Sequence, residues 1–490
     1  MNHASFKRLR VLAILVAVAV AAAFAAQPSV KPDKAAVDVR VARVERGLLP
    51  PIVIAGRPLP AKTLVQRMAD LKVPGLSIAV INDGAIEWAK GYGVTEAGTT
   101  TPVTSQTLFQ AASISKPVAA LAALRLVEQG KLVLDEDVNG KLASWKVPEN
   151  DLTKTEKVTL RRLLSHTAGL TVSGFGGYPA DVPVSTLIQV LNGEKPANSA
   201  PIRVDVLPGS LWRYSGGGFT VAQQLMMDVS GRSFPVLLAD LVLKPVGMDD
   251  STYEQPLPGS RRPVAASGHT ADGDLLPGRY HTYPEMAAAG LWTTPTDLAK
   301  FLLEVRHALA GGSAVLTVET ARQMTTVQKS GYGLGLGIEG SGPSARFGHG
   351  GSNEGFKCQM TAFVESGRGA VVMTNGDRGG FLASEVLRSI AGEYGWPALQ
   401  PDEKKVVAVD PKVLAFFEGR YELRPGKFLD VKLEAGTLFV IDGDWKVELY
   451  PETETSFVEA DEGHTLVFVK GPDGRATHMM IDGQLKAPRR

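Results

Sequence analysis

The sequence predicts an α+β protein in which helices flank a sheet, followed by a small all-β module. Two observations point to this class. Within residues 61–396, segments with strand character stand near both ends and helical segments fill the middle, so one sheet must join distant parts of the chain. Beyond residue 411, short alternating segments are separated by Gly or Asp turns, which is typical of a separate β module.

The first 26 residues have the pattern of a secretory signal peptide. Lys7, Arg8 and Arg10 precede an uncharged apolar run that ends in small residues near Ala26. Because the run is short for a membrane span, we expect a cleaved signal rather than a retained anchor, and no membrane span after cleavage. The protein is therefore expected to be periplasmic or secreted, in a bacterium. Residues 27–60, rich in Pro and Val, are predicted to be a linker with at most one strand.

Local patterns predict the elements of the 61–396 domain. Asp83-Gly84 between two β-type runs is a strong hairpin signal, and Gly130 ends a long Ala- and Leu-rich helix. The polar stretch 397–411 is predicted to be a second linker, before the all-β module at 412–490. The expected helices are 61–72, 113–129, 160–164, 187–192, 220–229 and 380–394, and the expected strands are 75–81, 85–92, 333–338, 357–365 and 369–374.

Composition excludes several function classes. The formal net charge of +1 gives no support to a nucleic-acid partner. Cys358 is the single cysteine, so the chain has no internal disulfide, and its alternating segment favours a buried filler over a nucleophile. No His-Glu-x-x-His or His-x-His occurs, so we expect no metal and no cofactor. The absence of Gly-x-Ser-x-Gly argues against an α/β-hydrolase.

Ser113-Ile-Ser-Lys116, at the start of the long predicted helix, is the first of three chemical patterns. Residues i and i+3 share a helical face, so the Lys116 amine can lie beside the Ser113 hydroxyl and accept its proton. Pro117 belongs in a first helical turn, which places that hydroxyl near the positive end of the helix dipole. Taken alone, the pattern is more simply explained by a capping serine and a solvated lysine.

Two glycine-rich patterns follow. Tyr214-Ser-Gly-Gly-Gly would let a tyrosine project from a loop and relay a proton, although a packed aromatic at a turn is the simpler interpretation. In His349-Gly-Gly351-Ser352, glycines on an edge strand would leave N–H groups free for an oxyanion hole. His349 could orient a substrate carboxylate or assist proton transfer; a solvated histidine at a hairpin corner is the alternative.

Together and in this order, the three patterns resemble those of the serine β-lactamase and penicillin-binding-protein superfamily, which includes class C β-lactamases, D-alanyl-D-alanine peptidases, D-aminopeptidases and related esterases. Flanking stretches strengthen the resemblance, which covers roughly residues 64–394: Leu164-Ser-His-Thr-Ala-Gly-Leu170, Lys244-Pro-Val-Gly-Met248 and Ala288-Ala-Gly-Leu-Trp-Thr-Thr-Pro295. The C-terminal module looks like the small β-barrel-like domain often appended to these hydrolases. The resemblance implies a β-lactamase/transpeptidase-like sheet flanked by helices.

The resemblance also implies roles for individual residues. Ser113 would be the acylated nucleophile, and Lys116 and Tyr214 would share general base and acid work. The backbone N–H groups of Ser113 and Ser352 would form the oxyanion hole, next to Gly351 and to His349, which stands where lysine is commoner. The tyrosine pattern usually ends in asparagine, whereas this chain has Gly216, so a substrate contact is missing and efficient β-lactam turnover is in doubt.

We therefore expect an exported serine hydrolase that forms an acyl-enzyme with ester, amide or β-lactam carbonyls of a small-molecule or peptide substrate. Two alternatives stay open: a D-alanyl-D-alanine carboxypeptidase or D-aminopeptidase, and a sensor or binding module that is acylated without turnover. Neither the natural substrate, the oligomeric state nor the role of the C-terminal module follows from the sequence.

Overall fold

The computed structural model describes residues 33–58, 62–443 and 445–490, so the predicted signal peptide lies outside the described residues. The chain divides into two compact units, residues 1–39 and 40–490, and the second holds every element discussed below except the start of helix α2 (Lys34–Arg46). Among the helices of the described ranges, none combines the length and apolar character that crossing a membrane requires.

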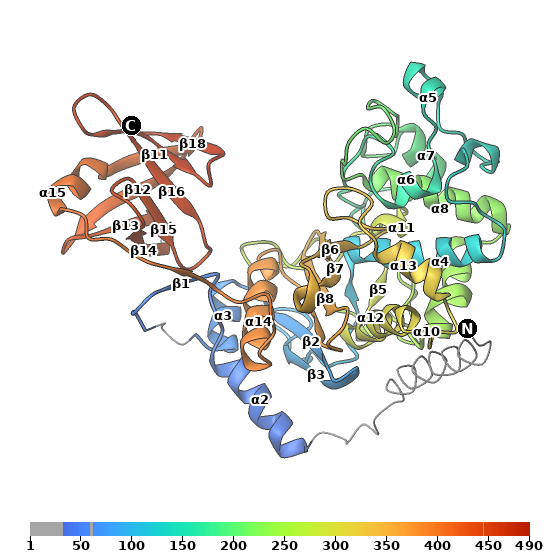
Figure 1. The fold of residues 1–490 in the computed structure, drawn as a ribbon, viewed down its shortest axis with the longest axis horizontal. Coiled ribbons are helices and arrows are strands. Elements are labelled where there is room, and N and C mark those ends of the chain that lie inside the picture. Colours follow the sequence, from blue (N-terminus) through green and yellow to red (C-terminus); the bar gives the residue numbers. More distant parts are fainter. Residues whose placement is uncertain (1–32, 59–61, 444) are drawn as a thin grey trace, which may run out of the picture. The chain divides into compact units, whose positions relative to one another are not determined.

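A six-stranded antiparallel sheet forms the centre of the 61–396 domain (Figure 1). Its spatial order is β3-β2-β9-β8-β7-β6, so strands from the start of the domain pair directly with strands from its end. This confirms the predicted sheet that joins distant parts of the chain. The strands are β2 (Gly75–Asn82), β3 (Ala85–Gly93), β6 (Gly337–Glu339), β7 (Arg346–Asn353), β8 (Phe356–Phe363) and β9 (Gly369–Thr374).

The predicted hairpin turn joins β2 to β3. Asp83 and Gly84 have φ values of 49° and 75°, which are the left-handed conformations that a two-residue hairpin turn needs. Asp tolerates this region better than most residues, and Gly adopts it freely.

Helices cover both faces of this sheet. Successive strand residues point to opposite faces, and on β9 Val371 and Met373 belong to the large core that includes helix α12 (Pro295–Leu309). Val372, between them, is also fully buried. Helix α14 (Gly379–Glu393) packs against β8 and β9, and we place it on this second face. The domain is therefore layered helix, sheet, helix.

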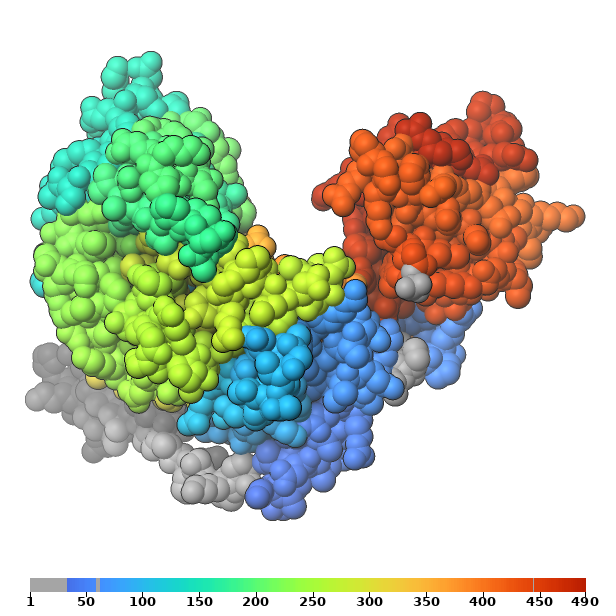
Figure 2. Space-filling view, turned by 180° about the vertical axis from the view of Figure 1, so that it is seen from behind, coloured from blue at the N-terminus to red at the C-terminus, as the bar shows by residue number. Residues whose placement is uncertain are grey.

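The chain between β3 and β6 is mostly helical and contributes most of the large core. Figure 2 shows most of it as a continuous surface that runs from cyan through green to yellow. Its elements are β4 (Phe109–Gln110), η1 (Ala112–Ile114), α4 (Ser115–Glu128), η2 (Val138–Gly140), α5 (Asp151–Thr155), α6 (Leu160–Leu164), α7 (Leu187–Asn192), α8 (Gly216–Ser230), α9 (Phe234–Leu238), η3 (Ala239–Leu243), α10 (Lys244–Val246), η4 (Arg262–Val264), α11 (Met286–Ala289), β5 (Trp292–Thr293) and α13 (Val318–Thr325).

The C-terminal module is an eight-stranded antiparallel sheet in which each strand pairs with the next along the chain. A bridge between Tyr421 and Arg489 joins its first strand to the end of its last, so the sheet nearly closes into a barrel. Its own core contains Phe417 and Phe468, whose rings stack with centroids 4.7 Å apart. The strands are β11 (Gly419–Arg424), β12 (Lys427–Glu434), β13 (Thr437–Asp442), β14 (Trp445–Pro451), β15 (Ser456–Glu459), β16 (Thr465–Lys470), β17 (Ala476–Ile481) and β18 (Leu485–Pro488).

Several elements differ from the expectations. The 27–60 segment, predicted to be a linker, contains helix α2 and strand β1 (Ile52–Ile54), and β1 pairs in parallel with β10 (Asp402–Lys404) of the other predicted linker. Strand character was expected at 333–338, but the β6 ladder covers only 337–339. Two short helical segments precede the first strand of the module: α15 (Pro411–Leu414) and η6 (Ala415–Phe417).

Candidate active site

Ser113 lies in the single turn η1, directly before helix α4, instead of inside the long helix predicted over 113–129. Ala112, the residue before it, has φ of 50°, a left-handed conformation that costs energy for a residue with a Cβ atom. Hydrogen bonds from both sides hold this strained backbone. Ala111 N–H donates to Leu291 O over 2.8 Å, and the Ser115 hydroxyl donates to Ala112 O over 2.6 Å.

Lys116 is buried and in contact with Ser113. Its Nζ lies 3.0 Å from Ser113 Oγ and donates to the Ala288 carbonyl over 2.8 Å. Burial lowers the pKa of the Lys116 amine to about 7. Near neutral pH a large fraction of this amine is therefore uncharged and able to accept a proton. The i, i+3 spacing from the sequence places both groups together as expected, although a turn boundary lies between them.

Tyr214 packs against the same amine. Lys116 Nζ lies 4.9 Å from the centroid of the Tyr214 ring. Burial raises the pKa of Tyr214 to about 12, with the neighbouring Ser113 hydroxyl opposing the shift, so the phenol stays protonated at neutral pH.

The glycines after Tyr214 form the first turn of helix α8, where a loop was expected. Ser215 caps this helix by accepting from Gly218 N–H over 3.0 Å. A Cβ on Gly217 would lie 2.7 Å from Thr171 O, and one on Gly216 would lie 3.1 Å from Ser173 O. The glycines thus permit close packing of the helix start on the 171–175 loop.

Strand β7 carries His349, Gly351 and Ser352, and it passes close to the Ser113 turn. A Cβ on Gly351 would lie 2.3 Å from Ala111 O and 2.4 Å from Cys358 Sγ, so only glycine fits at this crossing. Cys358 itself is buried with its Sγ 3.1 Å from Ala111 O, as expected for a buried filler.

The backbone of Ser352 faces an unpaired edge of β7. Strand β6 pairs with residues 346–348, and no other strand of the described ranges pairs with this edge beyond them. Ile338 donates its N–H to Gly331 O and therefore not to β7. Because hydrogen-bonded and non-hydrogen-bonded pairs alternate along an antiparallel ladder, the backbone groups of the neighbouring pair, Gly337 and Gly348, point toward each other. With the two-residue period of a strand, Ser352 N–H points to the same side as Gly348. A free donor is thereby available beside the Ser113 turn.

His349 is half-buried, and both of its ring nitrogens have partners. Nδ1 donates to Gly350 O over 2.5 Å, and Nε2 lies 3.0 Å from the Tyr332 hydroxyl. Because a carbonyl can only accept, Nδ1 carries the proton and Nε2 accepts from Tyr332. Burial, and then the charge of Lys116, lower the pKa of His349 to about 4. The ring is therefore neutral and differs from the lysine that it replaces.

Three contributors to this site were not recognised from the sequence: Ala288, Tyr332 and His166. His166 accepts from Ser215 N–H through Nδ1 over 3.1 Å, and its ring centroid lies 4.3 Å from that of Tyr214. Burial, with the charges of Lys116 and His349, holds its pKa well below the usual range. These contacts orient the segment that carries Tyr214.

No group of three or more His, Cys, Asp or Glu side chains within the described ranges is arranged to hold a metal ion.

Residues 61–392 match the family model described as Beta-lactamase. The chain belongs to the beta-lactamase family. Members of this family are serine hydrolases, and so is this protein. It is 22% identical to penicillin-binding protein 4* of Bacillus subtilis over 453 residues, which cover 86% of this chain and 96% of that protein. It is 27% identical over 313 residues to esterase EstB of Burkholderia gladioli, with coverage of 58% and 76%.

A solved structure shows that the whole fold has a counterpart within the family. The octameric penicillin-binding protein homologue from Pyrococcus abyssi superposes with a TM-score of 0.59 at 24% identity, covering 86% of this chain and 98% of that one. The likeness confirms the β-lactamase-like fold with its small C-terminal β module.

Proposed function

We propose that this serine hydrolase cleaves carbonyl substrates through an acyl-enzyme on Ser113, and that simple esters are its best substrates. The observation that carries the proposal is the 3.0 Å contact between Lys116 Nζ and Ser113 Oγ inside a buried site. A buried amine of lowered pKa beside a serine hydroxyl is a means of activating a nucleophile at neutral pH.

Acylation proceeds by attack of Ser113 Oγ on the substrate carbonyl while its proton passes to Lys116 Nζ. The N–H groups of Ser113 and Ser352 stabilise the negative oxygen of the tetrahedral intermediate. Tyr214, a phenol at neutral pH, donates a proton to the leaving group as the carbonyl–leaving-group bond breaks. Lys116 then returns the serine proton to Tyr214, so the net transfer is from serine to leaving group.

Deacylation reverses these roles with water as the nucleophile. Water gives a proton to the Lys116–Tyr214 pair, its oxygen bonds to the acyl carbon, and Ser113 Oγ leaves with a proton from the same pair. The product is the free acid, and the pair returns to its starting state. The neutral Lys116 amine and the protonated Tyr214 that this cycle needs at the start are the forms favoured at neutral pH.

Preference for esters follows from two residues. Gly216 has no side-chain amide to hold a substrate amide, and His349 has no charge to hold a carboxylate at neutral pH. An ester carbonyl is reactive without either contact, so an oxyanion hole suffices. The similarity to esterase EstB supports this choice.

The test is a substrate panel of p-nitrophenyl acetate, D-alanine p-nitroanilide and nitrocefin, combined with intact-mass detection of the acylated protein. We expect p-nitrophenyl acetate to be hydrolysed fastest, and Ser113→Ala to lose several orders of magnitude in rate on every accepted substrate while remaining folded. Peptide mapping should place the acyl group on Ser113 and not on Ser115, which is two residues away and serves as an internal control. Near-wild-type activity of Ser113→Ala would contradict the proposal, and a stable mass gain without turnover would identify an acylated sensor instead.

We also propose export through the first 26 residues, to the periplasm or the medium. Their charge and apolar pattern supports it. N-terminal sequencing of the protein secreted by a bacterial host should begin after the Ala23–Ala26 region, and recovery of the uncut N-terminus in the cytoplasm would contradict it.

A further inference from the structure

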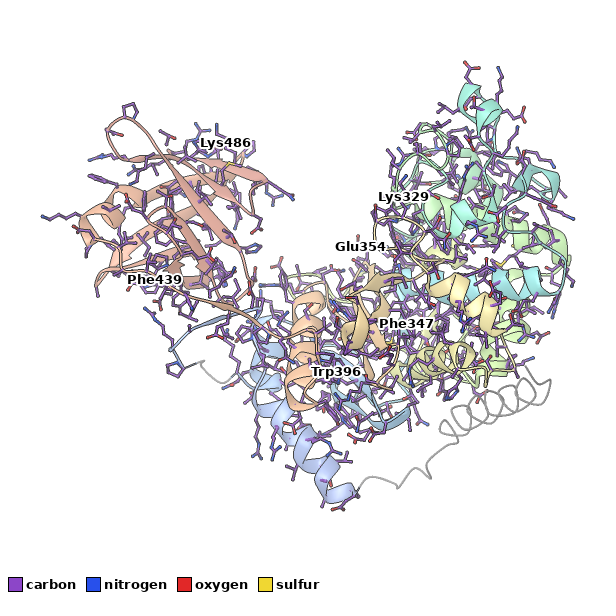
Figure 3. All side chains as sticks on the ribbon, viewed as in Figure 1. Lys329, Phe347, Glu354, Trp396, Phe439 and Lys486 are labelled. Carbon is purple, nitrogen blue, oxygen red and sulfur yellow. The ribbon has the colours of Figure 1, made fainter. Side chains whose placement is uncertain are left out.

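A cleft of about 450 Å³ lies beside His349 and is lined mainly by apolar and aromatic side chains. Phe347, on β7, is labelled in Figure 3. Its apolar and aromatic lining residues include Trp212, Tyr214, Tyr332, Phe347, Met360 and Leu387. An apolar lining of this kind favours an apolar substituent of the substrate.

The leaving group of the substrate occupies this cleft in the proposed mechanism. Tyr214 must touch the leaving atom to protonate it. Tyr214 and His349 both line the cleft, and their ring centroids are 6.2 Å apart. We therefore place a leaving group that contacts the Tyr214 hydroxyl in this cleft, beside the His349 ring.

The basic side chains near this cleft already have partners. Arg346, at its rim, forms an ion pair with Glu339. Lys116 Nζ donates to Ser113 Oγ and Ala288 O. His349 uses Nδ1 for Gly350 O, and its Nε2 receives the Tyr332 hydroxyl. A carboxylate that entered the cleft would lose its hydration without gaining a free donor among these three groups.

Tyr332 is buried, and its hydroxyl has one role that the structure shows: the hydrogen bond to His349 Nε2. The rings of Tyr332 and His349 also meet edge to face, with centroids 6.0 Å apart. Tyr332 thus occupies Nε2, the position at which His349 would otherwise take up a proton and donate to a substrate carboxylate.

We propose that Tyr332 is a specificity-determining positioning residue: by donating to His349 Nε2 it makes the leaving-group cleft select uncharged, apolar leaving groups and reject those that carry a carboxylate. The inference rests on the proposed function. It excludes peptides with a free C-terminal carboxylate as good substrates and points to neutral aryl or alkyl esters.

The test compares phenyl acetate with 3-carboxyphenyl acetate at pH 7. Both esters give the same acetyl-enzyme, so any difference in kcat/KM arises before the leaving group departs. We expect the wild type to prefer phenyl acetate at least tenfold. Tyr332→Phe frees Nε2 to take up a proton and donate it to the carboxylate, and it should raise the carboxylate-to-neutral ratio of kcat/KM about five- to tenfold, through a lower KM for the carboxylate ester.

A double-mutant cycle separates this effect from packing. In a His349→Ala background, Tyr332→Phe should leave the ratio unchanged, because the ring that it releases is absent. A wild-type preference for the carboxylate ester would overturn the proposal without any variant. So would a Tyr332→Phe enzyme that loses activity equally on both esters, or a ratio that shifts equally in the His349→Ala background. Failure of the proposed function would appear differently, as turnover of both esters by Ser113→Ala.

Discussion

Protonation of Lys116 should control the rate of acylation near neutral pH. The folded protein lowers the pKa of this amine to about 7 through burial, whereas an ordinary lysine has a pKa of about 10.4 and would be only about 0.04% neutral at pH 7. A lowered pKa favours the neutral base above pH 7 and the protonated, inactive form below it. We therefore expect kcat/KM to rise with pH and to level off above about pH 8.

The expected fall in kcat/KM at low pH follows from the pKa of Lys116. With a pKa of about 7, roughly one-tenth of the amine is neutral at pH 6 and roughly one-hundredth at pH 5, so kcat/KM should fall about tenfold per unit below the midpoint. His349 and Tyr214 should not titrate in this range, because the pKa of His349 is lowered to about 4 and that of Tyr214 is raised to about 12.

The assay is kcat/KM for phenyl acetate between pH 5 and 9, followed by release of phenol and corrected for spontaneous hydrolysis. His349→Gln serves as the control, since it removes the other base nearest the site and should keep the inflection near pH 7. An inflection that disappears in His349→Gln belongs to the histidine, and a wild-type profile that is flat from pH 5.5 to 8.5, or that rises only above pH 9, would refute the assignment of Lys116 as the base.

Two further predictions concern the proton-transfer pair and the strand crossing. Lys116→Ala and Tyr214→Phe should each lower kcat/KM for phenyl acetate by about 10² to 10⁴, and the double variant should be little worse, because the two act as one unit; a loss equal to the product of the single losses would contradict this. Gly351→Ala should lower the free energy of unfolding by about 1–3 kcal/mol in urea denaturation because its Cβ would meet backbone at 2.3 Å. Gly350→Ala, whose Cβ would have its nearest contact at 3.8 Å, should change stability little, and equal losses in both variants would show that the crossing is not the cause.

Contacts within one turn of chain were predictable from the sequence. The Ser113–Lys116 contact follows from i, i+3 spacing, which survives although Ser113 stands in η1 and Lys116 in α4. The β2–β3 hairpin follows from Asp83-Gly84, since few residue pairs adopt that turn. Both depend on local backbone geometry, which local sequence encodes.

Contacts between segments that are distant in the chain could not be predicted from local sequence patterns in the same way. Ala288 takes part through its backbone carbonyl, which every residue has, so its side chain carries no information about the role. Tyr332 stands in a glycine-containing loop before β6, and only the folded chain shows that its hydroxyl meets His349 on β7. Helix α2 was missed for a different reason: its composition is poor in the large apolar residues that mark an amphipathic helix.

The pairing of β2 with β9 has a consequence for synthesis of the protein. Leu76 is the register partner of Thr374, almost 300 residues later, and β9 lies between β2 and β8 at the middle of the sheet. Contacts at such separation form slowly, because the loop must close before they contribute. A ribosome has therefore made Ser113 and helix α4 long before β2 can pair with β9, and a chain that stops short of β9 should contain the nucleophile and β7 without the strand that links β8 to β2.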